Sequence, residues 1–475
     1  MNGFKPQAKP DAIARGEITL TPPRGAFDPQ SISQTSNANS AQLARNLGLF
    51  DGTMLVMGGI IGSGIFMNPH VVAEVVHTPE LILGAWAAGG LIALAGAFIY
   101  AELAALRPQV GGQYAYIREA FHPIAAFIYG WTLLLVVQSG GMAAVAVTFA
   151  RYFLDLTHVG LPEWIIAAIA LAGLTIVNCL GVRAGSAVQS VLMVLKILAI
   201  VALIGFGMFV SSESGNASIQ NAPRFELGLL TAFGAAMVPV LFAFGGWQTA
   251  SFVAGEMREP RRNLPRALLI GVVGVIILYL AVNFVCIHAL GTEGLAASKT
   301  PASEVMWLAL GDRGRRFIAI GIAISTLGFL SQGMLTAPRV YFAMADDGVF
   351  FKRVASLHPR SRVPAAAIAL QGALAIIIAM SGRYEQILNY VVSVDSIFFG
   401  LTAACLFALR KRSASESAGF ARRVNPIVIL LFIIAEWLVA ASAIYKDPRN
   451  SLIGVVILIA GVPVYYFWKA RGKRE

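Results

Sequence analysis

The sequence predicts an all-α polytopic membrane protein with twelve transmembrane helices. Hydrophobic residues make up 57% of the chain and charged residues 13%, and the mean hydropathy is +0.71. Soluble domains usually carry about 25% charged residues. Apolar runs of the roughly 20 residues that cross a bilayer recur along the chain. Two of these runs are interrupted by glycine pairs, and the interruptions indicate what the helices do.

The apolar runs place the spans in order, with boundaries uncertain by several residues. We predict spans at approximately 47–76, 80–106, 121–153, 163–181, 186–210, 230–256, 266–290, 316–344, 363–381, 384–409, 424–445 and 451–468. They group into a five-helix repeat over 46–215, a second over 225–410, and two further helices with a short cytoplasmic tail over 420–475. Residues 1–45 have no apolar core, so we expect a disordered cytoplasmic tail and not a signal peptide.

The distribution of Lys and Arg sets the orientation. With the N-terminus inside, 25 of them fall on the cytoplasmic side and 8 on the other side. Cytoplasmic loops carry such an excess, so we predict a multi-pass protein of the plasma (inner) membrane with both termini in the cytoplasm. The loop from Lys299 to Arg316 departs from this rule, and we expect it to form short helices over the outer surface. The net charge of +11 is thereby explained without a nucleic-acid partner.

The first span contains the sequence GGIIGSGIF at residues 58–66. Its glycines allow close helix packing, or they break the helix so that its free backbone groups bind a solute. The sixth span contains LFAFGGWQT at residues 241–249, which is again a glycine pair inside an apolar helix. Interrupted spans at matching places in two halves favour an inverted-repeat transporter with its site at the membrane midplane.

The two breaks offer complementary backbone groups. Amides at Gly62, Ser63 and Gly64 would begin the second half of span one and bind a carboxylate. Alternatively, the Ser63 hydroxyl bonds back to its own helix. Carbonyls near Phe242, Ala243 and Gly245 would accept hydrogen bonds from an ammonium group. An α-amino acid carries both groups.

Aromatic side chains surround the second break. Phe242 is the best candidate for a gate over the substrate, whereas Phe244 and Trp247 are pocket residues or packing residues. The remaining polar residues of the spans have a structural explanation as well. Gln138 and Gln332 line a pocket or join helices. Four charged residues near span ends are expected to pair or to lie at the interface, namely Glu102, Glu256, Arg339 and Glu436.

Two ionisable residues lie deep within spans. Lys196 is too far from either end of span five to reach the interface. It replaces a bound sodium ion at the carbonyls of the first break, carries a proton, or is a structural hydrogen-bond donor. Asp395 in span ten is a proton carrier, a polar pocket residue, or a loop acid if the boundary is misplaced. Three cysteines, Cys179, Cys286 and Cys405, lie in apolar runs and are interpreted as packing residues.

These motifs resemble the amino acid–polyamine–organocation (APC) superfamily, and within it the L-type amino acid transporter branch, as a prokaryotic member. GIIGSGIF at 59–66 matches its first-helix signature, and FAFGGW at 242–247 is similar to its sixth-helix motif. GEMREP at 255–260, NLPRA at 263–267, and Val188-Gln189 ahead of Lys196 follow the same pattern. The likeness covers nearly all of residues 45–470.

The resemblance implies a LeuT-like fold of five plus five helices with broken helices 1 and 6 and two added helices. It implies sodium-independent transport, with Lys196 in the place of the sodium ion. It assigns Ile60, Ser63 and Gly64 to the substrate carboxylate, and Phe242 and Gly245 to the amino group and gate. Together with the residues argued above, the predicted substrate-binding set is Ile60, Ile61, Gly62, Ser63, Gly64, Phe242, Ala243, Phe244 and Gly245.

The chain departs from the branch at three places. Animal members are joined to a heavy chain through a cysteine in the loop after span three, and that loop here, DLTHVGLP at 155–162, has none. We therefore expect no disulfide-linked heavy chain, and a monomer or weak homo-oligomer. Gln248 stands where members often have Asn, and Asp395 where they tend to have a neutral polar residue.

We therefore expect a secondary transporter of neutral L-amino acids that works by alternating access, as an exchanger. The alternatives are a proton-coupled symporter and a cationic amino acid or polyamine antiporter; the latter would need more pocket acids than Asp395. A channel or a transporter-like sensor comes next. No span carries the clustered His, Cys or acidic residues of a catalytic or metal site, so we expect no enzyme, no cofactor and no metal.

Overall fold

The computed structural model describes residues 43, 45–210, 227–381, 384–412, 424–446 and 448–472. Residues 43–475 form one compact unit. Nearly all of the predicted tail lies outside the described residues. The same holds for the predicted boundaries between the two repeats and before the last two helices.

The described chain is helical, apart from its loops and one isolated backbone bridge between Leu47 and Met257. The helices, with π and 3-10 segments written η, are α2 (Leu49–Ile60), α3 (Gly64–Val76), α4 (Pro79–Leu106), α5 (Gln113–Ala120), α6 (Pro123–Thr132), η1 (Leu133–Gln138), α7 (Ser139–Thr157), α8 (Glu163–Leu180), α9 (Val182–Met208), α10 (Leu227–Phe244), η2 (Trp247–Glu256), α11 (Pro260–Ala297), α12 (Pro301–Leu310), α13 (Asp312–Thr336), α14 (Pro338–Asp346), η3 (Lys352–Ala355), α15 (Ala365–Met380), α16 (Tyr384–Arg412), α17 (Pro426–Lys446) and α18 (Pro448–Gly472).

The helices of the structure match the predicted spans, so the chain is a multi-pass membrane protein. Within the described residues, ten helical segments are long and apolar enough to cross a bilayer. The pair α2 and α3 passes the same test together and is bent by 41° at its break. The predicted ninth span corresponds to α15, which is shorter at 16 residues. Twelve spans and their inverted repeat stay predictions.

Proline begins many of these helices. Pro79 opens α4, Pro123 opens α6, Pro260 opens α11 and Pro301 opens α12. Proline suits the first helical position because the amide it lacks would have no partner there. The short helix α12 lies in the loop from Lys299 to Arg316, where the sequence predicted short helices.

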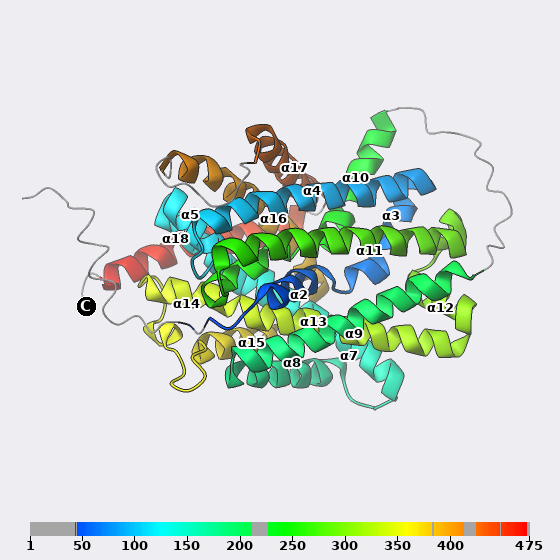
Figure 1. The fold of residues 1–475 in the computed structure, drawn as a ribbon, viewed down its shortest axis with the longest axis horizontal. Helices are drawn as coiled ribbons and strands as arrows, with labels where there is room; N and C mark the ends of the chain where they lie inside the picture. Colours follow the sequence, from blue (N-terminus) through cyan, green and yellow to red (C-terminus); the bar gives the residue numbers. More distant parts are fainter. Residues whose placement is uncertain are drawn as a thin grey trace, which may run out of the picture. The chain divides into compact units, whose positions relative to one another are not determined.

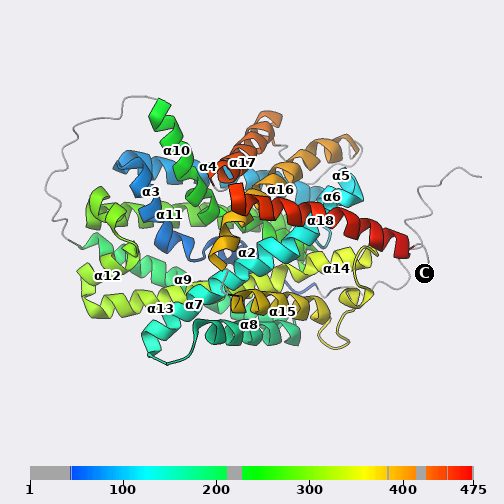
Figure 2. The same cartoon turned by 180° about the vertical axis from the view of Figure 1, so that it is seen from behind.

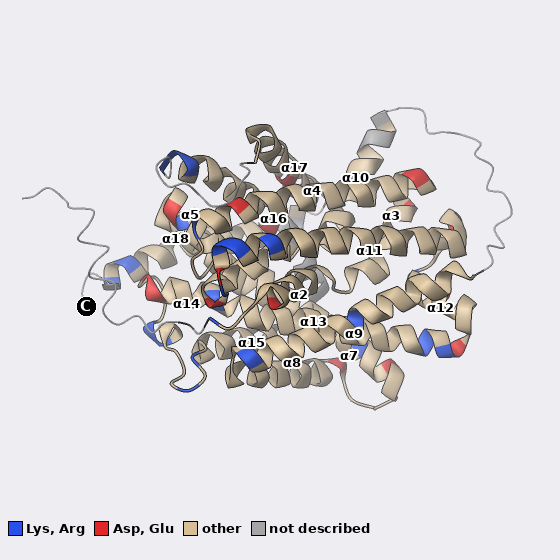
Figure 3. Cartoon of the chain, in the orientation of Figure 1, with Lys and Arg blue, Asp and Glu red and all other residues tan. Residues whose placement is uncertain are grey.

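The broken helix pair α2 and α3 packs against α11, and in Figure 1 α2 is seen between α11 and α13. Helix α11 packs along α4 and crosses α2 and α9. From behind, α7 and α18 cover the other side, where α18 packs against α6 (Figure 2). Most charged residues lie near helix ends, with long uncharged stretches between them (Figure 3). The few polar residues in the middle of the helices are therefore the candidates for a functional site.

Candidate functional site

A cavity of about 130 Å³ lies where the two broken spans meet. A single water needs roughly 10–15 Å³, so the cavity has room for a solute of several heavy atoms. Its walls come from both breaks and from η1, α7, α13, α16 and α17. The predicted site residues that line it are Ile60, Gly62, Ser63, Gly64, Phe242, Ala243, Phe244, Gly245 and Asp395.

At the first break, α2 ends at Ile60 and α3 begins at Gly64. The first amides of α3 have no partner within the helix and point toward its N-terminal side. The Ser63 side chain makes no capping hydrogen bond to the helix, although Ser63 occupies the N-cap position. Gly62, Ser63 and Gly64 all line the cavity. The break thus presents the group of donors that a carboxylate requires.

The second break is a glycine turn followed by a 3-10 segment. Helix α10 ends at Phe244, and η2 begins at Trp247. Gly246 has φ of 101°, a left-handed conformation that glycine adopts without a steric penalty. A Cβ on Gly59 would lie 2.5 Å from the Gly246 carbonyl oxygen. The two breaks are therefore in direct backbone contact at Gly59, which also lines the cavity.

The carbonyls freed by the first break are met by side chains from three other helices. The Tyr279 hydroxyl of α11 lies 3.1 Å from the Ile60 oxygen. The Lys196 ammonium of α9 donates to the Ile61 oxygen. The Ser325 hydroxyl of α13 donates to the Gly62 oxygen at 3.1 Å. Backbone groups at membrane depth need such partners because no water reaches them.

Lys196 and Ile61 lie beside the cavity and do not line it. Lys196 is fully buried, and its side-chain nitrogen donates a hydrogen bond to the Ile61 carbonyl of the unwound backbone. The Ile61 side chain is also fully buried. Both residues therefore belong to the break without facing the cavity, and Ile61 contacts Lys196 through its backbone carbonyl.

Of the three carbonyls predicted for an ammonium, two already accept hydrogen bonds. The Phe242 oxygen accepts from the Gly245 amide at 3.2 Å, and the Ala243 oxygen lies 3.2 Å from the Tyr279 hydroxyl. Each carbonyl oxygen has two lone pairs and so can accept a second bond. Tyr279 contacts carbonyls of both breaks. Sequence reasoning missed it because a single hydroxyl in an apolar run does not show which side of the helix faces the site.

The part of the cavity wall formed by α16 and α17 carries two carboxyl groups. Asp395 lies within α16 and lines the cavity, so it is not a loop acid. Glu436 of α17 also lines the cavity, is 6% exposed and accepts a hydrogen bond from Ser396. Its expected place at a span end, paired or at the interface, is wrong. Helix α17 continues for ten residues beyond it, to Lys446.

Three glutamines line the cavity, namely Gln138, Gln248 and Gln332. Gln138 ends η1, a π-helical turn of a kind often found at functional sites. Gln332 donates to the Thr249 hydroxyl at 2.5 Å and so joins α13 to η2. The side-chain oxygen of Gln248 is buried without a hydrogen-bond partner.

Aromatic rings close the apolar part of the cavity. Trp247 stacks on Phe399 with ring centroids 5.7 Å apart and meets Tyr100 edge-on at 4.8 Å. Phe244 packs against Trp86 and Tyr279. Phe242 is half-buried and lines the cavity, as a residue that closes over a solute would do.

The other predicted acids are paired, away from the cavity. Glu256 and Arg339 form an ion pair at 2.6 Å with both side chains fully buried. Glu102 and Arg410 pair at 2.6 Å. The backbone of Leu47, just before α2, bonds on both sides of Met257, just after η2. Both broken spans are thus fastened together at this end of the bundle.

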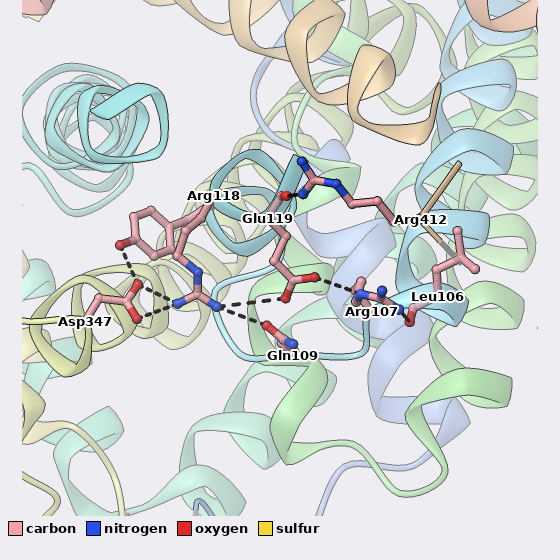
Figure 4. A network of polar contacts seen from close by, with 8 residues as sticks. Leu106, Arg107, Gln109, Arg118, Glu119, Asp347 and Arg412 are labelled. Atoms are coloured by element: carbon pink, nitrogen blue, oxygen red, sulfur yellow. Dashed lines mark hydrogen bonds and ion pairs between the residues drawn. The ribbon is translucent and has the colours of Figure 1, made fainter. Parts of the chain in front are cut away.

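A second polar network lies at the same end, between α5 and α14 (Figure 4). Arg118 contacts Asp347 at 2.5 Å, and the Tyr114 hydroxyl donates to the same carboxylate at 2.7 Å. Burial and the Asp347 charge raise the pKa of the Tyr114 hydroxyl well above its usual range. Glu119 joins Arg107 to this group at 2.7 Å. The network ties the loop after α4 to the end of α14.

The chain matches known proteins over almost its whole length. The family model described as amino acid permease matches residues 47–465. The serine/threonine exchanger SteT of Bacillus subtilis is 30% identical over 433 residues, which cover 90% of this chain and 98% of that protein. The large neutral amino acids transporter small subunit 2 of Rattus norvegicus is 30% identical, covering 95% and 86%.

A third relative, the human b(0,+)-type amino acid transporter 1, is 29% identical over 453 residues, which cover 93% of this chain and 91% of that protein. The family match and these relatives point to the same class of protein as the two glycine breaks that line the cavity. The chain belongs to the amino acid permease family, in the L-type branch of the APC superfamily.

Proposed function

We propose that this protein exchanges L-amino acids across the plasma membrane by alternating access, independently of sodium, with neutral amino acids as substrates. The observation that carries the proposal is the cavity between the two breaks. Gly62 to Gly64 of the first break and Phe242 to Gly245 of the second break line this cavity, and we assign their backbone amides and carbonyls to the substrate. A zwitterion spans such a pair of groups. The relatives named as exchangers and amino acid transporters support the same activity.

Lys196 supports sodium independence. Its ammonium is bonded to a carbonyl that the unwound helix leaves free, which is the kind of group that coordinates a sodium ion in transporters with broken helices. A fixed cation at this place removes the need for a mobile one. Replacing external sodium with choline should leave uptake unchanged.

Proteoliposomes test exchange directly. Vesicles loaded with unlabelled leucine, alanine or serine should take up the same labelled amino acid far faster than empty vesicles. Equal rates would refute exchange. A rate that follows an imposed pH gradient, and loses that dependence in Asp395→Asn, would support proton-coupled symport instead, because Asp395 lines the cavity.

A substitution at Gly64 tests whether the cavity between the two breaks binds the substrate. A Cβ there lies 3.3 Å from Ala243, so Gly64→Leu would push its side chain across the space between the breaks. We expect uptake and ligand-induced thermal stabilisation to fall at least tenfold. Gly173→Leu is the matched control, because Gly173 of α8 is exposed and has no atom within 4 Å of its added Cβ. Ligand binding that survives Gly64→Leu would remove the site assignment.

The Lys and Arg distribution supports the proposed orientation. Those of α5, α16 and the loop after α14 lie at the end where the polar networks close the bundle (Figure 3). We propose that this end faces the cytoplasm. A single cysteine introduced at Gly311, outside the spans, should then react with a membrane-impermeant maleimide added to intact cells, whereas one at Ser356 should not.

A further inference from the structure

Two carboxyl groups line the cavity without a cation beside them. In the described part of the chain, neither Asp395 nor Glu436 forms an ion pair with Lys or Arg. Ser396 bonds to Glu436 but carries no charge. An intramembrane acid is costly to bury and usually has a partner. The partner of this pair is therefore expected among the solutes that enter the cavity.

The groups facing this pair do not supply the missing charge. The titratable side chains around it are Tyr100 of α4, Tyr129 of α6 and Cys405 of α16. None of these side chains provides a positive charge. Glu102 of α4 is engaged with Arg410, and Lys196 is bonded to the Ile61 carbonyl on the far side of the first break.

A third group at the cavity also needs a donor. Gln248 is 3% exposed, lines the cavity, and its side-chain oxygen has no hydrogen-bond partner. A buried acceptor left unpaired costs free energy. The Trp247 ring stacks on Phe399 of α16, which brings the start of η2 against the helix that carries Asp395. An ammonium group offers three donors and a positive charge.

We propose that Asp395, Glu436 and Gln248 form a cation subsite, which holds the side-chain ammonium of a dibasic L-amino acid or, when a neutral amino acid is bound, a proton. The subsite rests on the proposed amino acid transport. The first break holds the substrate carboxylate, and the side chain extends toward α16 and α17. Two nearby carboxylates resist full ionisation, so one proton stays with the pair until a cation replaces it.

This substitution sets the charge balance of exchange. When lysine enters the cavity, its ammonium takes the place of one proton, which leaves to the solution. When a neutral amino acid enters, one proton enters with it. Exchange of external lysine for an internal neutral amino acid therefore moves one proton outward for each lysine moved inward, and no net charge crosses the membrane.

The test compares lysine with norleucine, which has the same carbon chain without the side-chain ammonium. Proteoliposomes containing wild-type protein and internal norleucine are offered labelled lysine or labelled norleucine at pH 6 and pH 8. We expect the ratio of lysine to norleucine uptake to rise at least fivefold between pH 6 and pH 8. A pH-sensitive dye inside the vesicles should report loss of one proton per lysine, and an imposed membrane potential should leave the lysine rate unchanged.

Isosteric variants localise the effect. At pH 8, Asp395→Asn and Glu436→Gln should each lower the lysine to norleucine ratio at least tenfold, the low end of the effect for a hydrogen bond to a charged group. Glu293→Gln is the matched control, because Glu293 is exposed near the end of α11 and outside the cavity. A ratio unchanged in both cavity variants would overturn the proposal.

Two results separate this inference from the proposed function. Exchange of norleucine without any uptake of lysine at either pH would overturn the cation subsite and leave amino acid exchange intact. Absence of exchange for norleucine and for leucine, alanine and serine would overturn the proposed function itself. If the variants do not fold, thermal stabilisation of the wild type by lysine and by norleucine tests the subsite independently. Stabilisation by lysine that does not increase from pH 6 to pH 8, relative to norleucine, would contradict the subsite.

Discussion

Glu256 and Glu436 are both enclosed in the protein, and they differ in what faces them. Glu256 meets the Arg339 guanidinium at 2.6 Å, and neither side chain has any exposed surface. Glu436 accepts a hydrogen bond from the Ser396 hydroxyl and lines the cavity. Glu256 has its countercharge within the chain. Glu436 has empty space beside it that could hold a positively charged group.

The difference separates structural acids from site acids. A buried pair is hard to break because removing one partner leaves an uncompensated charge. Such a pair suits the end of the bundle, where Glu256 and Leu47 fasten the two broken spans. An enclosed acid without a countercharge has no such holding role. Together with Asp395 it forms the cation subsite that we propose.

The largest effect should come from breaking the structural pair. Arg339→Met leaves the Glu256 carboxylate buried and alone, and should destabilise the protein by about 3–5 kcal/mol. Thermal melting in detergent and the folded yield measure the loss. The double variant Glu256→Gln with Arg339→Met should recover most of it. A single variant as stable as the wild type would mean that Glu256 is not held by Arg339.

The next effect concerns the link between the breaks. Tyr279→Phe removes the hydroxyl that contacts the Ile60 and Ala243 carbonyls. One buried polar group left unsatisfied costs about 1–3 kcal/mol. We expect a loss of about 2 kcal/mol and a weaker substrate affinity, read from melting curves with and without substrate. Tyr445→Phe, at an exposed tyrosine of α17, is the control.

Replacing the unpaired acid should act in the opposite direction. Glu436→Gln replaces one of two neighbouring carboxyl groups with a neutral amide and so relieves their mutual repulsion as the pair ionises, which means that the empty protein should melt at a higher temperature. The gain is about 1 kcal/mol, the order of the desolvation cost of one buried polar group. It should appear at pH 8 and fade at pH 5, where carboxyl groups take up protons. A loss of stability like that of Arg339→Met would erase the contrast between the two acids.

The smallest effect belongs to the partly exposed network. Arg118 and Asp347 keep 30% and 27% of their side chains exposed. Solvent and salt screen such a pair, so Arg118→Gln should cost less than about 1 kcal/mol. Melting at about 0.05 M and about 1 M salt should show the wild type approaching the variant at high salt. If the loss of stability in Arg118→Gln did not change with salt, this ion pair would be as well shielded from solvent as the buried pair of Glu256 and Arg339.

Much of the fold and part of the site could be predicted from local sequence. Apolar length and charge placed the spans, because a bilayer imposes both requirements on each helix separately. The glycine pairs located both breaks, since a backbone that unwinds or touches another backbone needs residues such as Gly59 and Gly246. The residues predicted around them line one cavity, apart from Ile61 and Lys196.

The missed residues depend on how helices rotate against each other. Glu436, Tyr279 and Ser325 lie on three helices distant from the breaks in sequence, and a single polar residue does not show which way its helix faces. The π-helical turn η1 adds to the difficulty, because it shifts the register that brings Gln138 to the cavity. Glu256, Arg339 and Glu436 were all expected to pair or to lie at the interface, whereas the partner of Glu256 and the different position of Glu436 needed the packed structure.

The Tyr279 hydroxyl has a single hydrogen and lies within reach of two carbonyl oxygens, 3.1 Å from Ile60 and 3.2 Å from Ala243. At any instant it can satisfy only one of them. The two carbonyls therefore compete for the same hydrogen. In the proposed site, a substrate ammonium that donated to one carbonyl would release the hydroxyl to the other, so the two breaks would respond to the same ligand before any helix moved.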